Sequence, residues 1–374
     1  MEILHFNSNY LHSPLYSEMF NQLEKQGVRN DVIMPRKIKD EANVSDKLIE
    51  TNTNVFEKQF LKSTDRFFYF KKQKKILAWV QSLNFDLNDY DIVHAHTLFS
   101  DGYQALKSGK PYIVTVRNTD INFYMKFYKH LLPLGRKILK KASQIIFLSE
   151  SYKNNTIEML FGTRKIKKEI YEKSHVIPNG INDYWLKHSS DQTKHINEDI
   201  NVICVCRIMK NKNLEFLAEN LTAKNLGRNV NIYIVGDVVD LKYYQNLKKY
   251  PNMYFLGKKG KQNIVEIMKN MHVFIMVSFT ETFGLVYLEA LTQNLPVIYT
   301  KNEGFDKYFE EGYVGYSVNP TNNNELIKQV RKIIENYNVI QKNISQIDKK
   351  RFSWQNNALK HKEIYEIAKA RVEQ

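Results

Sequence analysis

The feature that most constrains this chain is a buried-strand pattern that runs almost directly into a helix pattern. The segment Val273–Val277 (VFIMV) is short, wholly apolar and partly β-branched, which predicts a buried strand. From Gly284 to Leu291, apolar residues recur at the spacing of a helix. A strand followed closely by a helix is the unit of an open parallel sheet, whose ligands bind beyond the carboxyl ends of the strands.

Two glutamates flank this junction. Glu281 follows the predicted strand, and Glu289 falls within the predicted helix among apolar neighbours. Glutamate is seldom buried without a partner, so hydroxyl groups of a sugar donating to Glu289 are one interpretation, and two ordinary surface glutamates are the other. The amides of Phe283, Gly284 and Leu285 would be unpaired donors at the start of the helix, suited to a phosphate.

The composition places limits on the class of protein. A chain of 374 residues is long enough for two domains, and its 43% hydrophobic and 25% charged content is ordinary for a globular protein. Its two cysteines, Cys204 and Cys206, alternate with valine, which predicts buried thiols and a reducing compartment. We find no secretory signal pattern and no apolar run of membrane-spanning length, so we expect the protein in the cytoplasm.

The chain carries a formal net charge of +15, and two stretches of its first half combine aromatic with basic residues. These are Glu57–Val80 and Phe123–Lys141, the second of which Pro133 and Gly135 are predicted to divide into two short helices. Three interpretations stay open: single-stranded nucleic-acid binding, amphipathic helices on an anionic membrane surface, and helices packed on their own domain. The concentration of these stretches in the first half favours a membrane-facing N-terminal domain, and no nucleic-acid partner is expected.

The segment from Glu281 to Glu289, followed by Ala290–Val297, resembles the E-x7-E signature of retaining glycosyltransferases with the GT-B fold (group 1, family 4 type). The family usually has glycine where this chain has Asn294, and asparagine also tolerates the left-handed conformation that ends a helix. The resemblance implies that the first glutamate contacts the donor sugar and the second the ribose hydroxyls. It also implies that the turn beginning at Thr282 holds the diphosphate.

Further residues of the second half carry the same resemblance. Arg207 and Lys212 match the family's R-x4-K element, and two cations where a strand ends suit a diphosphate. With the turn amides they would stabilise the departing diphosphate, so the resemblance implies no metal and no cofactor. We also find no Asp-x-Asp motif at a strand end. Gly236, Gly257 and Lys258 follow two other predicted strands, and the resemblance places them on the donor side.

The first half resembles the family less closely. Asp91–His96 (DIVHAH) is similar to the family's D-x-x-H-x-H segment, and it predicts a strand end that brings two histidines, among them His96, to the crevice. Two histidines in i,i+2 positions without a third ligand make a weak metal site, and none is expected. Many relatives have a histidine that touches the donor sugar where this chain has Arg117. Asn118 and Asp120 are candidates for further contacts with the sugar or acceptor.

The resemblance implies an α/β architecture with the GT-B fold, in which two Rossmann-like domains face each other across a cleft. Residues 1–184, together with a C-terminal helix over 353–374 that crosses back, would form the acceptor-binding domain. Residues 185–352 would form the nucleotide-sugar-binding domain.

The expected function is retaining, metal-independent transfer of a hexose or N-acetylhexosamine from a nucleotide sugar, with a UDP-sugar as the expected donor. The acceptor would be a lipid-linked or cell-surface glycan in polysaccharide biosynthesis, with the enzyme peripheral on the inner face of the membrane. A nucleotide-sugar epimerase of the same fold is an alternative, with Asp91, Asp101 and Asp120 as its candidate acids, whereas a pyridoxal-dependent phosphorylase would be much longer. A basic nucleic-acid-binding protein would explain the charge but not Glu281 and Glu289.

Overall fold

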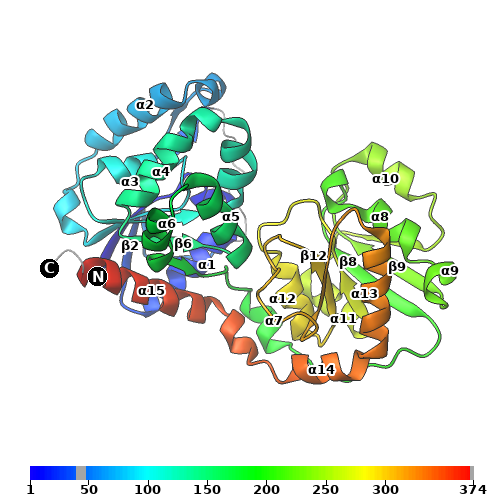
Figure 1. The fold of residues 1–374 in the computed structure, drawn as a ribbon. Helices are drawn as coiled ribbons and strands as arrows, with labels where there is room; N and C mark the ends of the chain where they lie inside the picture. Colours follow the sequence, from blue (N-terminus) through cyan, green and yellow to red (C-terminus); the bar gives the residue numbers. More distant parts are fainter. Residues whose placement is uncertain (39–47, 371–374) are drawn as a thin grey trace. The chain divides into compact units, whose positions relative to one another are not determined.

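A computed structural model describes residues 1–38 and 48–370 of the chain. It divides into two compact units, each built around one parallel sheet with helices packed on it (Figure 1). Unit 1 consists of residues 1–148, 152–180 and 354–374, and unit 2 of residues 149–151 and 181–353. The last four positions of the predicted C-terminal helix, 371–374, lie outside the described residues.

The sheet of unit 1 has seven strands in the order β3-β2-β1-β4-β5-β6-β7, and every neighbouring pair is parallel. The strands span Glu2–Phe6 (β1), Arg29–Lys37 (β2), Asn54–Leu61 (β3), Ile92–Ala95 (β4), Tyr112–Val116 (β5), Gln144–Phe147 (β6) and Ser174–Val176 (β7). The chain runs outward from β1 to β3 and then returns to place β4 on the other side of β1. The point between β1 and β4 is therefore the topological switch point of this sheet, where ligands bind in open α/β folds.

The α-helices of this half of the chain span Pro14–Lys25 (α1), Tyr69–Gln81 (α2), Gly102–Lys107 (α3), Leu132–Lys141 (α4), Glu150–Leu160 (α5) and Arg164–Glu172 (α6). The C-terminal helix α15 (Trp354–Ala370) packs on α1, and its apolar residues share a core with Ile3 and Phe20. Figure 1 shows this helix in red beside the blue elements of unit 1. The prediction that the C-terminal helix returns to the N-terminal domain is confirmed.

The structure divides the first aromatic and basic stretch and corrects one prediction for the second. The first residues of Glu57–Val80 belong to the edge strand β3, and only the part from Tyr69 onward is the helix α2. Pro133 and Gly135 do not divide the second stretch, since both lie inside α4. Proline costs nothing in the first helical turn, where its missing N–H would have no partner. Gly135 is required by packing, because a Cβ atom there would lie 2.9 Å from the Phe99 ring.

The sheet of unit 2 has six strands in the order β10-β9-β8-β11-β12-β13, again all parallel. They span Ile200–Val205 (β8), Val230–Val235 (β9), Met253–Gly257 (β10), Val273–Ile275 (β11), Val297–Thr300 (β12) and Gly315–Val318 (β13). Its α-helices span Asp183–Lys187 (α7), Leu214–Asn220 (α8), Ala223–Leu226 (α9), Leu241–Leu247 (α10), Lys261–Lys269 (α11), Leu285–Thr292 (α12), Asn323–Glu335 (α13) and Tyr337–Ser345 (α14). The switch point of this sheet lies between β8 and β11.

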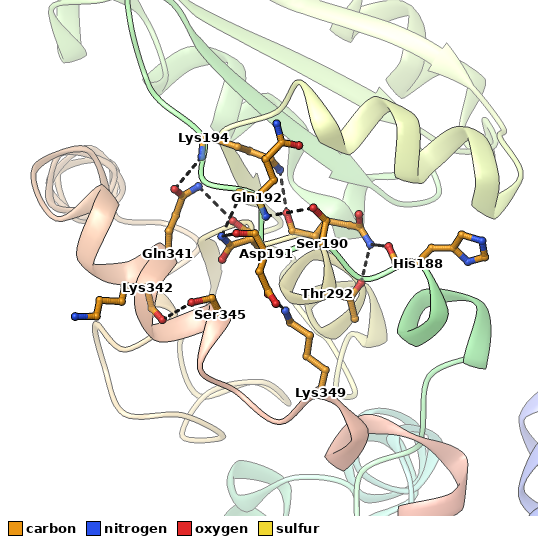
Figure 2. Close-up of polar contacts among 12 residues, drawn as sticks. His188, Ser190, Asp191, Gln192, Lys194, Thr292, Gln341, Lys342, Ser345 and Lys349 are labelled. Atoms are coloured by element: carbon orange, nitrogen blue, oxygen red, sulfur yellow. Dashed lines mark hydrogen bonds and ion pairs between the residues drawn. The ribbon is translucent and has the colours of Figure 1, made fainter.

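The predicted polar linker after α7 has no regular secondary structure, but hydrogen bonds and an ion pair hold it against the rest of unit 2 (Figure 2). The Lys194 side chain is buried, and its Nζ donates to the carbonyl oxygens of Met268 and Gln293, each at 2.9 Å. These carbonyls lie at the C-terminal ends of α11 and α12, where a cation interacts favourably with the helix dipole. Asp191 also forms an ion pair with Lys349. The linker therefore holds the C-terminal ends of α11 and α12. The N-terminal ends of these two helices lie at the carboxyl edge of the sheet.

Candidate functional site

The loops that follow β8 and β11 are joined at the carboxyl edge of the sheet of unit 2. The side chain of Asn211 accepts a hydrogen bond from Oγ1 of Thr280 at 2.9 Å and donates to its carbonyl oxygen at 3.0 Å. The amide of Phe279 donates to the carbonyl oxygen of Asn211 at 2.9 Å. These bonds hold the two loops in one arrangement at the switch point.

Glu281 and Lys212, predicted from separate motifs, form an ion pair in this region. Nζ of Lys212 lies 2.7 Å from Oε2 of Glu281, and the two side chains are only 15% and 16% exposed. The other carboxylate oxygen accepts the Thr282 amide at 3.1 Å, and the Glu281 amide donates to the Glu303 carboxylate at 2.7 Å. The Glu281 carboxylate is thus held in a fixed orientation beside a cation.

Three glycines allow the backbone of these loops to approach closely. A Cβ atom on Gly304 would lie 1.9 Å from the carbonyl oxygen of Thr282, and one on Gly236 would lie 1.9 Å from that of Cys206. Gly284 adopts the left-handed conformation (φ +79°) immediately before α12, where side chains are disfavoured. Gly236 and Gly284 are predicted site residues, whereas Gly304 was missed because no motif marks it.

The first turn of α12 presents free backbone donors. Within the described residues, the amides of Phe283, Gly284 and Leu285 have no hydrogen-bond acceptor. The Phe283 side chain is buried, with its ring centroid 5.1 Å from that of Tyr308, so its function is packing and only its backbone is available. Three unpaired donors at the positive end of a helix form a site for an anion.

The remaining predicted donor-side residues lie along the same edge of the sheet. Arg207 is exposed in the loop after β8. The Gly236 amide, after β9, donates to the carbonyl oxygen of Gly257 at 3.0 Å, at the end of β10. Lys258 forms an exposed ion pair with Asp237 at 3.0 Å. The sheet order therefore places all of these predicted residues at strand ends on one edge.

Glu289 lies inside α12 and is partly buried. Burial raises its pKa to about 7, and the positive charge of Lys261 and the indole of Trp185 act in the opposite direction without cancelling that effect. Near neutral pH this carboxyl group therefore exists in both protonation states. A ligand that donates hydrogen bonds to the carboxylate would favour the charged form.

The predicted sugar or acceptor residues of unit 1 are only partly available. Asp120 is fully buried, and its two oxygens accept the amides of Leu98, Phe99 and Arg117 at 2.9–3.0 Å. The structure therefore does not support a direct contact between Asp120 and a ligand. Its carboxylate instead joins the loops that follow β4 and β5. Arg117 and Asn118 are partly exposed in the second of these loops.

The histidines of the DIVHAH segment are not exposed in a crevice, contrary to the prediction. His94 and His96 are fully buried, and Nε2 of His96 lies 2.9 Å from Nδ1 of His5. The three histidines form a cluster whose nitrogens lie within 4.8 Å of one another. His94 also binds Thr115 and Tyr365 through its two ring nitrogens, each at 2.8 Å. Burial lowers the pKa of all three histidines, so they are neutral core groups, and the predicted absence of a metal stays a prediction.

Both halves of the chain match models of glycosyltransferase families. The family model "Glycosyl transferases group 1" matches residues 187–360, and the model "Glycosyltransferase Family 4" matches residues 16–184. The alpha-monoglucosyldiacylglycerol synthase of Acholeplasma laidlawii is 28% identical over 276 residues, 67% of this chain and 68% of that protein. The capsular polysaccharide biosynthesis glycosyltransferase CapM of Staphylococcus aureus is 27% identical over 59% of this chain and 60% of that protein.

Solved structures show the same fold at lower identity. Anabaena HepE in complex with UDP and glucose has a TM-score of 0.67 and 20% identity, with 97% of this chain and 98% of that chain covered. The sucrose-phosphate synthase of Thermosynechococcus elongatus has a TM-score of 0.70 and 15% identity, with 98% of each chain covered. Separately, no helix in residues 1–38 and 48–370 combines the length and the apolar character needed to span a bilayer.

Proposed function

Because the chain belongs to the group 1 glycosyltransferases and has their GT-B fold, we propose that it transfers a hexose or N-acetylhexosamine from a UDP-sugar with retention and without a metal ion. Nucleotide-sugar transfer follows from the family, and the finer statements are our proposal. The observation that carries them is the Lys212–Glu281 ion pair beside the free amides of the α12 turn. It combines a group for the sugar with donors for a diphosphate.

The proposed chemistry depends on charge that develops as the glycosidic bond breaks. The departing diphosphate gains negative charge, which Arg207, Lys212 and the amides of the α12 turn would stabilise. Glu281, held by Lys212, would orient the sugar, and Glu289 would accept hydrogen bonds from the ribose. No side chain is assigned as a covalent nucleophile. The proposal that no metal is required rests on these two cations, of which Lys212 is paired with Glu281 and Arg207 follows β8 at the same edge of the sheet as the α12 turn.

Hydrolysis of a panel of nucleotide sugars tests the donor and the metal requirement together. We expect UDP-sugars to be turned over in preference to GDP- and ADP-sugars, at an unchanged rate in EDTA. HepE, a protein of the same fold, was solved with UDP and glucose, which supports UDP as the nucleotide. An absolute requirement for Mn²⁺ or Mg²⁺ would overturn the metal-independent account, and turnover of only another nucleotide would overturn the donor.

The proposed acceptor is a lipid-linked or cell-surface glycan in polysaccharide biosynthesis. The name of one relative, a capsular polysaccharide biosynthesis glycosyltransferase, supports a glycan acceptor, and the name of another, an alpha-monoglucosyldiacylglycerol synthase, supports a lipid part in the acceptor. The epimerase alternative has no support from its candidate acids. Asp101 and Asp120 are buried and bonded to neighbouring loops, and Asp91 forms an ion pair with Lys369 at 2.8 Å.

An anionic membrane surface is the proposed partner of unit 1. Five phenylalanines, which we call the aromatic surface, lie in and just before α2 and in the 120–128 segment. Their exposed fractions are 44% to 66%: Phe67, Phe68, Phe70, Phe123 and Phe127. The two segments that carry them are in contact, with the rings of Tyr69 and Tyr124 6.4 Å apart. Exposed cations lie beside these rings in the sequence: Arg66, Lys71, Lys74, Lys126 and Lys129. Clustered exposed aromatics with cations suit a bilayer interface with anionic lipids.

Serine replacements at Phe67, Phe68 and Phe127 test this partner. The unmodified protein should sediment with anionic but not zwitterionic liposomes, and salt should release it. The triple variant should lose most of this binding, and each Lys→Ala change beside the aromatic surface should weaken it about fivefold, because a basic residue near the leaflet contributes roughly 1 kcal/mol. Leu241→Ser is the control, since Leu241 is 65% exposed in unit 2. Equal recovery in the supernatant with both liposomes would contradict the proposal.

A further inference from the structure

Arg117 is held in a defined orientation at the carboxyl edge of the sheet of unit 1. It follows β5, next to the β1/β4 switch point. Its Nε donates to the carbonyl oxygen of His96 at 3.0 Å, and its guanidinium carbon lies 5.0 Å from the centroid of the Tyr16 ring. Its backbone amide donates to the Asp120 carboxylate at 2.9 Å. The side chain and backbone are thus fixed by separate contacts.

The groups that hold Arg117 are themselves rigid. Tyr16, His96 and Asp120 are all buried, and the edge of the Tyr16 ring faces the His96 ring at a centroid distance of 5.3 Å. The Asp120 carboxylate is in turn bound by two amides of the loop after β4. A guanidinium held in this way loses little conformational freedom when it binds a ligand.

Arg117 has no acidic partner within the described residues. No carboxylate there forms an ion pair with it, and the hydrogen bond of its side chain runs from Nε to the backbone carbonyl oxygen of His96, so the two terminal nitrogens keep their donors. Two arginines of the neighbouring strand β2 differ, because Arg29 pairs with Glu2 and Asp31, and Arg36 pairs with Glu57. A partly buried cation is ordinarily paired, because removing a charge from water has a desolvation cost that a nearby counter-charge offsets.

We propose that Arg117 binds an oxyanion of the transferase substrate, either a phosphate or a sugar carboxylate. The two terminal nitrogens of a guanidinium match the paired oxygens of either group. This inference rests on the proposed function, because it assumes that a substrate of the transfer reaction binds at this edge of unit 1. It deepens that function by making the enzyme selective for an anionic substrate over a neutral one.

Two matched pairs of small probes test the proposal with the full chain and saturating UDP, at constant ionic strength. Glycerol 3-phosphate is compared with glycerol, and glucuronate with glucose, by ligand-observed NMR. We expect one anionic probe to bind at least about tenfold more tightly than its neutral counterpart, and the pair that shows this identifies the oxyanion. Arg117→Gln should remove the preference. Arg117→Lys should retain part of it, because lysine keeps the positive charge but lacks the two parallel N–H donors of the guanidinium.

Arg29→Gln is the matched control and should leave the preference unchanged. Arg29 is the first residue of β2, so it lies at the amino ends of the strands, whereas Arg117 lies at their carboxyl ends. UDP affinity, measured by calorimetry, should be the same in Arg117→Gln as in the unmodified protein. Equal binding of charged and neutral probes, or a preference that survives in Arg117→Gln, would overturn the inference while UDP binding persists. Failure of the unmodified protein to bind UDP would instead overturn the proposed function.

Discussion

Replacing Lys212 with alanine is expected to lower kcat by about 10²- to 10³-fold, the cost of removing a donor that stabilises transition-state charge. Lys212 serves two groups at once in the proposed site. It would neutralise the departing diphosphate, and its Nζ holds the Glu281 carboxylate at 2.7 Å. Its removal would therefore leave a largely buried carboxylate without its counter-charge, and would free the group that orients the sugar.

Comparison with two neighbouring cations makes this measurement specific. Arg207→Ala should lower the rate by about 10²-fold, since it removes one charge-stabilising group but leaves the Glu281 ion pair. Lys210→Ala is the control, because Lys210 is exposed in the same short helix as Lys212. All rates are measured in EDTA, and thermal denaturation confirms folding. If Lys212→Ala were no worse than Lys210→Ala, the proposed site would be wrong.

Glutamine replacements at Glu281 and Glu289 are expected to separate two functions. A contact that strengthens in the transition state lowers kcat when it is removed, whereas a uniform binding contact mainly raises KM. Glu281→Gln should therefore act chiefly on kcat. Glu289→Gln should act chiefly on the KM for the donor and should also weaken binding of free UDP.

The pH dependence of UDP binding is an independent signature of Glu289. Burial raises the pKa of this carboxyl group in the free protein to about 7, and ribose hydroxyls would bind its charged form. UDP affinity should therefore rise as the pH rises through 7, with a loss of about tenfold at pH 6 relative to pH 8, because binding must release the proton. Glu289→Gln should remove this dependence.

The pH dependence of stability provides the matching control, because the raised pKa of Glu289 also sets the direction in which stability changes with pH. Since the pKa of Glu289 is raised on folding, the folded state binds more protons than the unfolded chain between about pH 4.5 and 7. The contribution of Glu289 to stability therefore falls over this interval, and Glu289→Gln should raise the thermal midpoint at pH 8 but not at pH 4. If only Glu281→Gln weakened UDP binding, the two assignments would be reversed. If neither variant changed UDP binding, both glutamates would have a structural role.

The sequence by itself determined the fold class and most of the donor side of the candidate site. Two parallel sheets with helices and a returning C-terminal helix were predicted from strand and helix periodicity and from the family resemblance, and the structure confirms them. The left-handed Asn294 (φ 55°) at the end of α12 was also predicted correctly. The strands, the helices and the Asn294 turn depend on residues close together in the chain, and the donor-side grouping depends on the rule that parallel strands end at one edge of their sheet. The return of the C-terminal helix was predicted from the family resemblance alone.

Only the tertiary structure decided which side chains meet. The ion pair of Lys212 with Glu281 joins residues 69 positions apart, and the close approach of Gly304 to Thr282 has no sequence signal. Burial likewise turned His96 and Asp120 from predicted ligand contacts into core groups. His96 packs against His5 of β1 and against the rings of α1, and Asp120 joins the loops after β4 and β5. Such contacts depend on strand order, register and loop packing between distant segments, which local periodicity does not record.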